Sequence, residues 1–530
     1  MHPVVRIFAK LLDNGVKKWY YYINYIMKGR KTMKKIRIFA GIMALLMLAL
    51  CFASCANTPT EQGDGTTAST PDATNAPAAT TETPETTYPV DENGYELDRL
   101  PELNYNGEEF VIFTWSNQTM WEWNEDETTN GDKIHDAIYN RQVRVEERLG
   151  IDIALSKQTG DWNNRNSFIV TVEANVNAGQ SDAFDLVGQY TPAAPIGAMK
   201  NLYMDLSKVQ HLDWERPWWP SDIQESCHIN NNVYFITGDI TGTLVRNVQS
   251  VICNLDLAEN HNLPNVYDLV DKHEWTMDKF MEIAVGTIQG INADGSTAYS
   301  ITFPNNVAYD NLFYGAGFRF VDHDADGKLI MSEDLSGERL ETWFQTCRGL
   351  LFDNADVEIL AINGANGFAS GNVLFHCGQI ADVQNNLQEV NFDFAVLPYP
   401  MYDKDQEDYY TITSYWVSMY SIPTNAADPS MSAAVLECLS SYGYRYLTPV
   451  IYQEAFQYRY LDTLENARMF DLLHDTLVFD PGRLFADQLN CFAAFRQAAQ
   501  ETGSTSWSTY YAGQKNVWSK SLSKIISTLG

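Results

Sequence analysis

The sequence predicts an α/β fold divided into two lobes, and two observations carry the prediction. Residues 97–530 form a region larger than the size at which one hydrophobic core stops growing, so two lobes or domains are expected. Strand-like and helix-like segments alternate along the first part of that region, as they do where crossover helices join a parallel sheet. The first lobe should therefore be α/β.

The alternation begins with the segment "GEEFVIFTW", residues 107–115, which is typical of a buried strand. A helix is expected over 131–150, because Asp132 can cap its start and Gly150 can end it. Four apolar residues recur on one face of that helix: Ile134, Ile138, Val145 and Leu149. A strand, a helix and a strand should follow, at 151–157, 166–180 and 183–190.

The segment 33–54 has the pattern of a secretory signal peptide. Its apolar run 38–53 is shorter than the roughly 20 residues that a membrane-spanning helix needs, and basic residues stand just before it. The run ends in small residues at Cys55, and this junction resembles the lipobox of bacterial lipoproteins, in which the cysteine is acylated and becomes the mature N-terminus. The alternatives are an uncleaved signal anchor and acylation at Cys51, which Leu50 opposes because it is too large for the cleavage position.

The segments on either side of this signal fit the same interpretation. Residues 1–32 match neither a core nor a signal, so Met33 is the more natural start of the chain and 1–54 would be absent from the mature protein. Residues 55–96 contain almost no large apolar side chains and should form a disordered tether, with a reach of about 35 Å. We therefore expect a protein anchored to the cell membrane by a lipid on its extracellular face, or in the periplasm if the organism is Gram-negative.

The charge of the chain limits its partners. The sequence has 36 basic and 68 acidic residues, of which 10 basic and 1 acidic precede Cys55; the remaining 26 and 67 leave the mature chain at −41. Such a surface repels nucleic acid and anionic lipid and argues against polyanionic ligands. A neutral ligand fits best.

The cysteines do not form a recognisable metal or redox motif. Six follow Cys55, at wide spacings and without a C-x-x-C pair: Cys227, Cys253, Cys347, Cys377, Cys438 and Cys491. They are more typical of small buried hydrophobes than of a disulfide framework, although one or two disulfides stay open as an alternative. The lone His376 lies in an apolar strand and should be a core residue with satisfied hydrogen bonds.

One segment matches a metal-binding pattern. Residues 322–333 place Asp322, Asp324, Asp326 and Glu333 as in a calcium loop. No helix is expected before this loop, however, and an Asp-Gly turn between two short apolar runs favours a β-hairpin. We therefore predict a hairpin and no metal, with calcium as the weaker alternative.

Several segments, in order from about residue 104 to 530, resemble one family. They include "DAIYNRQVRVEERLGIDI", "RPWWPSDIQES", "NNVYFITGDIT", "DFAVLPYPMYDKDQEDYYT" and "SMYSIPTNAADPSMSAAVLECLSSYGY". Together they are similar to the extracellular solute-binding lipoproteins of bacterial ABC importers, in the branch usually assigned to carbohydrates. The resemblance implies a two-lobed periplasmic-binding-protein-like α/β fold with three hinge crossings, an interlobe ligand cleft, no cofactor, a monomeric state and a permease as partner.

The resemblance also implies where the chain crosses between lobes. The crossings would be "SVICNLDLAE", "NVLFHCGQI" and "SYWVSMYSIP". Lobe one would then comprise 97–254 and 376–416, and lobe two 255–375 and 417–530.

Four residues are candidates for binding the ligand. Trp115 and Tyr190 end the first and third expected strands, where open α/β sheets bind ligands, and Trp416 lies in the third crossing. Aromatic faces can stack on a pyranose, and Asp239, in a Gly-flanked loop that faces the cleft in the family, can accept hydroxyl protons. The alternatives are a place in the core for each aromatic residue and, for Asp239, a turn residue that caps backbone amides.

The function expected from these features is capture of a neutral carbohydrate and its delivery to an ABC permease, without catalysis. Acidic residues are so numerous that a carboxylate pair spaced for glycoside hydrolysis is uninformative, and no G-x-S-x-G, H-E-x-x-H or Walker motif is present. A secreted glycoside hydrolase and a surface carbohydrate-binding adhesin remain the alternatives.

Overall fold

A computed structural model describes residues 88–530 apart from short gaps. The gaps are 125–127, 182, 221–222, 224–227, 291–297, 305–306, 360–363, 388, 457–463 and 501–505. The described residues belong to one compact unit, Thr86–Gly530. The predicted signal peptide, Cys55, residues 55–87 of the tether and Cys227 lie outside the described residues, so those predictions stay predictions. Residues 88–96 were expected in the tether but pack on the folded part: Tyr88 lies under the Arg216 guanidinium, and the Glu96 carboxylate is 2.8 Å from Arg216. Within the described part, no helix combines the length and the hydropathy that a membrane span requires.

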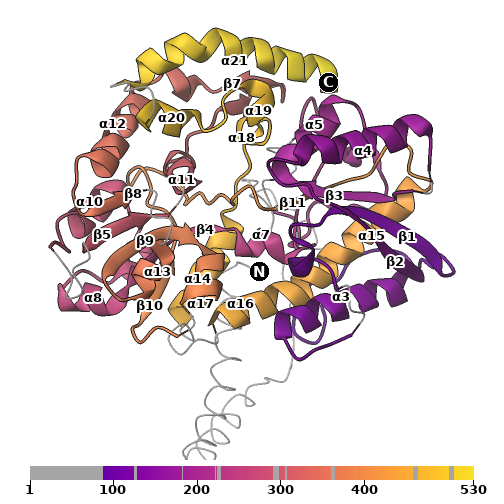
Figure 1. The fold of residues 1–530 in the computed structure, drawn as a ribbon, viewed down its shortest axis with the longest axis horizontal. Coiled ribbons are helices and arrows are strands. Elements are labelled where there is room, and N and C mark those ends of the chain that lie inside the picture. The colour runs from indigo at the N-terminus through magenta and orange to yellow at the C-terminus, as the bar shows by residue number, and fades with distance from the viewer. Residues whose placement is uncertain are drawn as a thin grey trace, which may run out of the picture. The chain divides into compact units, whose positions relative to one another are not determined.

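The first sheet confirms the predicted alternation of strands and helices. Its order is β11-β3-β1-β2, and it lies on the right of Figure 1. β1 (Glu108–Trp115) pairs in parallel with β2 (Ile151–Gln158) and with β3 (Leu186–Tyr190), whereas β11 (Ser418–Ser421) runs antiparallel to β3. The carboxyl ends of the three parallel strands therefore meet at one edge of the sheet.

The helices between these strands begin and end as their sequence indicates. α3 (Lys133–Leu149) starts where Asp132 accepts a hydrogen bond from the backbone N–H of His135, 2.8 Å away, and ends where Gly150 takes a left-handed conformation with φ of 64°. α4 (Arg165–Ala178) follows β2 and ends at Gly179 in the same way. Three more helices belong to this part of the molecule: α5 (Ala194–Met199), α7 (Gly242–Arg246) and α15 (Pro429–Tyr442).

The second sheet has five strands in the order β10-β4-β9-β5-β8 and lies on the left of Figure 1. They are β4 (Gln249–Asn254), β5 (Tyr299–Phe303), β8 (Val357–Ile359), β9 (Val373–Gln379) and β10 (Phe394–Leu397). β9 pairs antiparallel with β4 and parallel with β5, so the sheet is mixed. The side chains of β4 and of β9 are buried almost throughout, as in a sheet that is covered on both faces.

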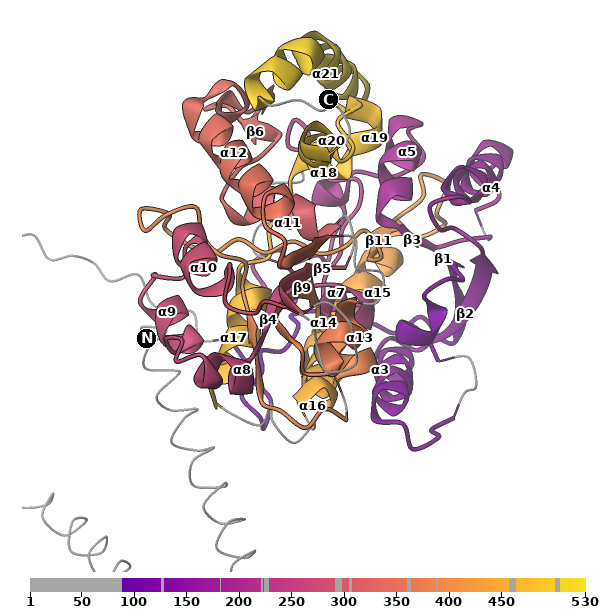
Figure 2. The same ribbon diagram turned by 60° about the vertical axis from the view of Figure 1, so that its left-hand side comes forward.

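The helices of the second lobe surround this sheet. They are α8 (Leu255–Asn260), α9 (Val266–Asp271), α10 (Met277–Ala284), α11 (Val307–Gly315), α12 (Glu338–Phe352), α13 (Gly364–Ala369), α14 (Ile380–Asn386) and α17 (Leu464–Asp475). A C-terminal group adds α18 (Pro481–Leu484), α19 (Ala486–Leu489), α20 (Ala494–Gln500) and α21 (Trp507–Leu529). α21 packs against β7 (Leu329–Met331) and α12, which lie below it in Figure 1, and Figure 2 shows the same end of the molecule from another side. At its far end, the carbonyl of Leu529 accepts hydrogen bonds from Asn232 and from the hydroxyl of Tyr234.

The structure places three strands in a different sheet from the one expected from the lobe boundaries. β4 and β10 were expected in lobe one but belong to the second sheet, and β11 was expected in lobe two but belongs to the first. The segment "NVLFHCGQI" is not a crossing, because β9 lies in the middle of the second sheet. A largely apolar segment of this kind is typical of a central strand. The expectation that it crosses between the lobes came from the family resemblance alone and was wrong.

The crossings lie instead in short extended segments. The backbone N–H of Gln249 donates to Ile412 O over 2.9 Å, and that of Ser414 donates to Asn247 O over 2.8 Å, so the first and second passages run side by side. The third passage lies between α15 and α17. α15 belongs with the first sheet, since the Ser432 hydroxyl donates to Asp185 O, and α17 belongs with the second sheet, since it packs against β10. We propose that the hinge runs through 247–249, 412–417 and the π-helical turn Gly443–Leu447 before α16 (Thr448–Phe456).

The segment 322–333 forms the predicted hairpin. β6 (Val321–His323) pairs antiparallel with β7 (Leu329–Met331), and Asp324 holds the turn by accepting hydrogen bonds from the N–H groups of Asp326 and Lys328. Glu333 begins the following turn of 3-10 helix instead of closing a loop. Among the residues that the structure describes, no group of three or more His, Cys, Asp or Glu side chains is arranged to hold a metal ion.

The cysteine and histidine predictions are confirmed for the residues described. Five cysteines are free and buried, namely Cys253, Cys347, Cys377, Cys438 and Cys491. His376 is fully buried in β9, with Nδ1 2.9 Å from the Thr302 hydroxyl and Nε2 3.3 Å from Asp382. It is a core residue whose two ring nitrogens both have partners.

Candidate functional site

Three of the four predicted binding residues come together in one aromatic cluster, formed by Trp115, Tyr190 and Trp416. The rings of Trp115 and Tyr190 are 5.1 Å apart between centroids, and that of Trp416 lies 5.7 Å from Trp115 and 5.8 Å from Tyr190. Trp115 ends β1 and Tyr190 ends β3, so both stand at the carboxyl edge of the first sheet. Trp416 comes from the segment that connects the two sheets, and its ring lies over the rings of Trp115 and Tyr190.

The cluster is layered from the core to the surface. Trp115 is fully buried and Tyr190 nearly so, whereas Trp416 is 41% exposed. The Trp115 indole N–H donates to the Ser418 hydroxyl over 2.5 Å, which fixes the base of the stack. Burial raises the pKa of the Tyr190 hydroxyl to about 12, so this group stays neutral. The core alternative thus applies to the two lower rings, while part of the Trp416 ring is exposed to solvent.

A tight loop after β2 packs beside the cluster. A Cβ on Gly160 would lie 2.8 Å from the Trp115 Cβ and 2.9 Å from Phe168, so only glycine fits there. Asn117 Oδ1 accepts a hydrogen bond from the Gly160 N–H, and Asp161 accepts from the N–H of Asn164. This loop places Asp161 and Arg165 near the Tyr190 hydroxyl. The charge of Arg165 acts to lower the pKa of that hydroxyl, and the charge of Asp161 acts to raise it.

The same loop contacts the C-terminal part of the chain. The Arg165 Nη2 and the Asp487 Oδ2 lie 3.1 Å apart, and the rings of Trp162 and Phe492 lie 4.8 Å apart. Arg165 also lies over the Trp162 ring. Two elements that belong to different lobes therefore meet next to the aromatic cluster.

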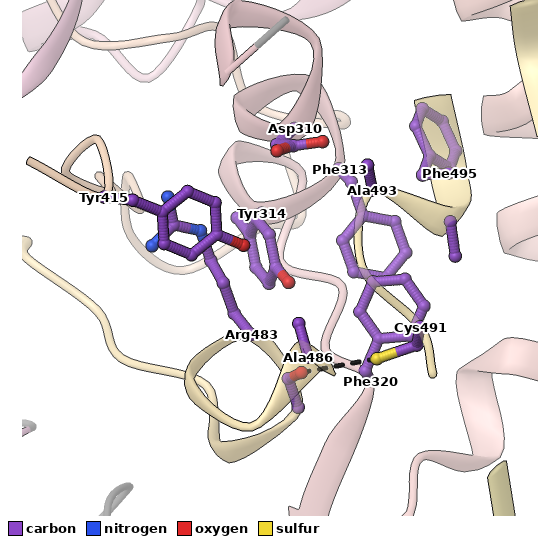
Figure 3. Close-up of a pocket in the computed structure, with 12 residues that line it drawn as sticks. Asp310, Phe313, Tyr314, Phe320, Tyr415, Arg483, Ala486, Cys491, Ala493 and Phe495 are labelled. Carbon is purple, nitrogen blue, oxygen red and sulfur yellow. Dashed lines mark hydrogen bonds between the residues drawn. The ribbon is translucent and has the colours of Figure 1, made fainter. Parts of the chain in front are cut away.

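A small pocket lies on the second-lobe side of this contact. Two of its lining residues connect it to the aromatic cluster. Tyr415 directly precedes Trp416 in the chain, and the positive charge of Arg483 acts to lower the pKa of the Tyr190 hydroxyl. The pocket is small, with room for about one water molecule. Figure 3 shows its lining: Asp310, Phe313, Tyr314, Phe320, Tyr415, Gly482, Arg483, Ala486, Cys491, Ala493, Ala494 and Phe495.

The charged groups of the pocket are buried. Asp310, on α11, and Arg483, on α18, are each only 6% exposed. Burial raises the pKa of the Asp310 carboxyl, and the positive charges of Arg496 and Arg483 oppose that shift. The Arg483 guanidinium lies 4.1 Å above the Tyr415 ring. Sequence analysis did not find this pocket, because its lining comes from segments far apart in the chain and none of them carries a motif.

Asp239 does not join the cluster. It is fully buried, accepts a hydrogen bond from the Thr448 hydroxyl over 3.0 Å, and its Oδ1 lies 3.5 Å from His474 Nε2. The carboxylate of Asp239 helps to raise the pKa of His474 to about 10 against the opposing effect of burial. These contacts join the loop before α7 to α16 and α17, which is a structural role, although not the amide cap that was the sequence alternative.

The fold is similar to that of solved substrate-binding proteins. One is the galacto-N-biose-/lacto-N-biose I-binding protein of the ABC transporter from Bifidobacterium longum, in complex with lacto-N-biose, at 12% identity and a TM-score of 0.52, over 79% of this chain and 98% of that one. Another is UgpB from Mycobacterium tuberculosis in complex with glycerophosphocholine, at 14% identity and a TM-score of 0.51, over 79% and 98%. No protein-family model matches the sequence, and no curated protein sequence matches it.

These likenesses establish the fold. The chain has the two-lobed, periplasmic-binding-protein-like α/β architecture of ABC-transporter substrate-binding proteins, as the sequence resemblance predicted. The first of these two structures is a binding protein by its description, and the second is described in complex with glycerophosphocholine.

Proposed function

We propose that this protein captures a carbohydrate outside the cell and delivers it to an ABC permease. The observation that carries the proposal is the partly exposed Trp416 ring, which stacks on buried Trp115 and lies tilted against Tyr190 where the two lobes meet. A rigid apolar ring of this kind suits the C–H face of a pyranose. The excess of acidic residues over basic ones favours a neutral sugar over a polyanion.

The anchoring of the protein is part of this proposal. A diacylglycerol on Cys55 and a tether from there to residue 87 would hold the folded part near the permease while leaving it free to move over about 30 Å. Lipidation is tested by mass spectrometry of the mature protein from its own host. An intact peptide that spans Ser54 and Cys55 would contradict it.

The test of capture is calorimetric titration of the folded protein with a panel of neutral mono- and oligosaccharides. We expect binding of at least one of them, and loss of about tenfold or more of that affinity in Trp416→Ala, because a stacked apolar face disappears. Val517→Ala is the matched control, since Val517 is also a partly exposed apolar residue, at 46%, but lies on α21. Equal affinity in the two variants would remove Trp416 from the site.

The same samples distinguish the alternative functions. A hydrolase would release smaller saccharides on prolonged incubation, whereas a binding protein returns its ligand unchanged. An adhesin would sediment with insoluble polysaccharide and would not bind a short soluble sugar. Either result would replace the proposed function.

A further inference from the structure

A buried carboxylate is connected to the aromatic cluster by hydrogen bonds. Glu122 follows the turn of 3-10 helix Thr119–Trp121 and is fully buried. Its Oε1 accepts hydrogen bonds from the hydroxyl groups of Thr241, over 2.9 Å, and Thr243, over 3.0 Å. The Tyr420 hydroxyl donates to Oε2 over 3.4 Å. A buried carboxylate is costly unless such donors surround it, and here they come from the start of α7 and from β11.

The surroundings of Glu122 favour its ionised form in spite of burial. Burial raises the pKa of its carboxyl, and neighbouring hydroxyl groups, that of Ser418 foremost, and the charge of Arg141 oppose that shift. Arg141, on α3, is also fully buried, and its guanidinium donates to the backbone carbonyl of Glu122. These neighbours each offer the carboxyl a hydrogen or a positive charge, so the site is built around an acceptor.

One path leads from Glu122 to the base of the cluster. Because the Thr243 hydroxyl donates its hydrogen to Glu122, its oxygen is left to accept from the backbone N–H of Ser418, 3.3 Å away. The Ser418 hydroxyl accepts in turn from the Trp115 indole N–H. The carboxylate thereby sets the direction of a chain of hydrogen bonds that ends on the ring against which Trp416 stacks.

A second path leads to the backbone of Trp416. The Asn247 Nδ2 donates to Thr243 O over 2.8 Å and to Trp416 O over 3.0 Å. The Ser414 hydroxyl donates to Asn247 Oδ1 over 2.8 Å and accepts from the Trp416 N–H over 3.3 Å. Both paths leave α7 at Thr243, so this residue joins Glu122 to the main chain of Trp416 as well as to the ring on which it stacks.

We propose that Glu122 is a positioning residue of the binding face: through Thr243 it holds Trp115 and Trp416 in the orientation that a sugar meets. The inference rests on the proposed function and adds a residue that does not itself touch the ligand, since it is fully buried. A face that is already held in its bound orientation loses less freedom on binding, so affinity should depend on these hydrogen bonds.

The first test measures affinity by calorimetry, with the neutral sugar that binds wild type most tightly. Glu122→Gln removes the charge that orients the hydroxyl groups, and Thr243→Val removes the hydroxyl that joins the two paths. Each should weaken binding about fivefold, the effect of one hydrogen bond. Thr243→Ser keeps the hydroxyl and should recover most of the affinity that Thr243→Val loses. Thr237→Val is the matched control, since its buried hydroxyl has no partner among the described residues.

The second test reports on the orientation of the cluster without a ligand. Heteronuclear NMR of protein labelled in its tryptophan side chains observes the indole N–H groups, and Trp115→Phe assigns the Trp115 signal by its absence. Glu122→Gln and Thr243→Val should shift that signal, because the bond to Ser418 is no longer held in place. Thr243→Ser should return it toward its position in wild type.

Glu437→Gln is the matched control for the loss of a buried charge. The Glu437 carboxylate, on α15, is 1% exposed and accepts from the indole N–H groups of Trp218, over 3.2 Å, and Trp219, over 3.1 Å. This variant should shift the signals of those two residues and leave both the Trp115 signal and the sugar affinity unchanged. Thermal melts establish that each variant is folded, and Thr243→Val, which removes no charge, decides the case if Glu122→Gln does not fold.

The possible outcomes separate this inference from the proposed function. If wild type binds a sugar and the folded variants of Glu122 and Thr243 bind it equally well, the positioning role is wrong and carbohydrate capture stands. The role is also wrong if affinity falls while the Trp115 signal stays in place, or if Thr243→Ser is no better than Thr243→Val, because the loss would then come from general destabilisation. If wild type binds no sugar, the proposed function fails and the positioning role fails with it.

Discussion

Two tryptophans of the same cluster have different environments and therefore different expected roles. Trp115 is fully buried, bonded to Ser418 and packed against Gly160, whereas Trp416 has solvent over part of its ring. The free energy of unfolding should depend on the first and ligand affinity on the second. The same cluster thus supports the fold at its base and presents the proposed binding face at its top.

Trp115→Ala should lower the free energy of unfolding by about 3–5 kcal/mol, since a large buried side chain is lost and a cavity remains. Trp416→Ala should change it by less than about 1 kcal/mol and act mainly on affinity. Urea unfolding of both variants beside wild type measures the difference. Equal destabilisation by the two substitutions would mean that Trp416 is part of the core.

The pair of Asp239 and His474 should make stability depend on pH. The pKa of His474 rises from 6.5 to about 10 in the folded state, because the Asp239 carboxylate favours the protonated ring. Because the folded-state pKa of His474 is raised, the contribution of this pair to the free energy of unfolding is complete below pH 6.5. It is lost as the pH rises through about 10.

His474→Gln should therefore be less stable than wild type near neutral pH, by several kcal/mol at most, and the difference should shrink toward pH 10 and above. Thermal melts of both proteins from pH 6 to pH 10.5 measure it. Parallel curves over that range would contradict the proposed ion pair.

At the scale of elements, glycines set how closely the loop after β2 approaches the first sheet. Gly160 lies under Trp115 and Phe168 with no room for a Cβ, while Gly513 on α21 has no atom within 4 Å of the place where a Cβ would stand. The first glycine is needed for packing, and the second only weakens its helix. The two positions form a matched pair for one substitution.

Gly160→Ala should destabilise the protein by about 1–3 kcal/mol, because overpacking displaces the base of the aromatic cluster. Gly513→Ala should stabilise it by about 0.5–1 kcal/mol through helix propensity and a less flexible unfolded chain. Urea denaturation of each variant determines the sign. A stabilising Gly160→Ala would show that the loop does not pack tightly on Trp115.

For the whole molecule, the sequence predicts local structure better than the division of the chain between lobes. The first strands, α3 and the hairpin follow from apolar periodicity, caps and turn residues, and Trp115 and Tyr190 meet because parallel strands end at one edge of a sheet. The place of β9 in the second sheet depends on tertiary pairing that no local pattern contains. The same holds for the partners of Asp239, because Thr448 and His474 lie 209 and 235 residues further along the chain. The pocket with Asp310 and Arg483 is hidden for the same reason.

The last prediction concerns motion of the two lobes about the proposed hinge. The passages 247–249 and 412–414 are hydrogen-bonded to each other, so they should turn together, while contacts such as Arg165 with Asp487 and Trp162 with Phe492 lie on the opening edge. If these edge contacts and the ligand both favour the closed state, adding a bound sugar to wild type should reduce the radius of gyration in solution scattering. Arg165→Ala should give a larger radius than wild type without ligand and should still contract with it, because the ion pair is partly exposed and contributes only about 1 kcal/mol or less. Trp416→Ala is the control: because its affinity should be about tenfold lower, it should need about tenfold more sugar than wild type to contract. A wild-type profile that stays unchanged at saturation would argue for a rigid groove and would favour the adhesin.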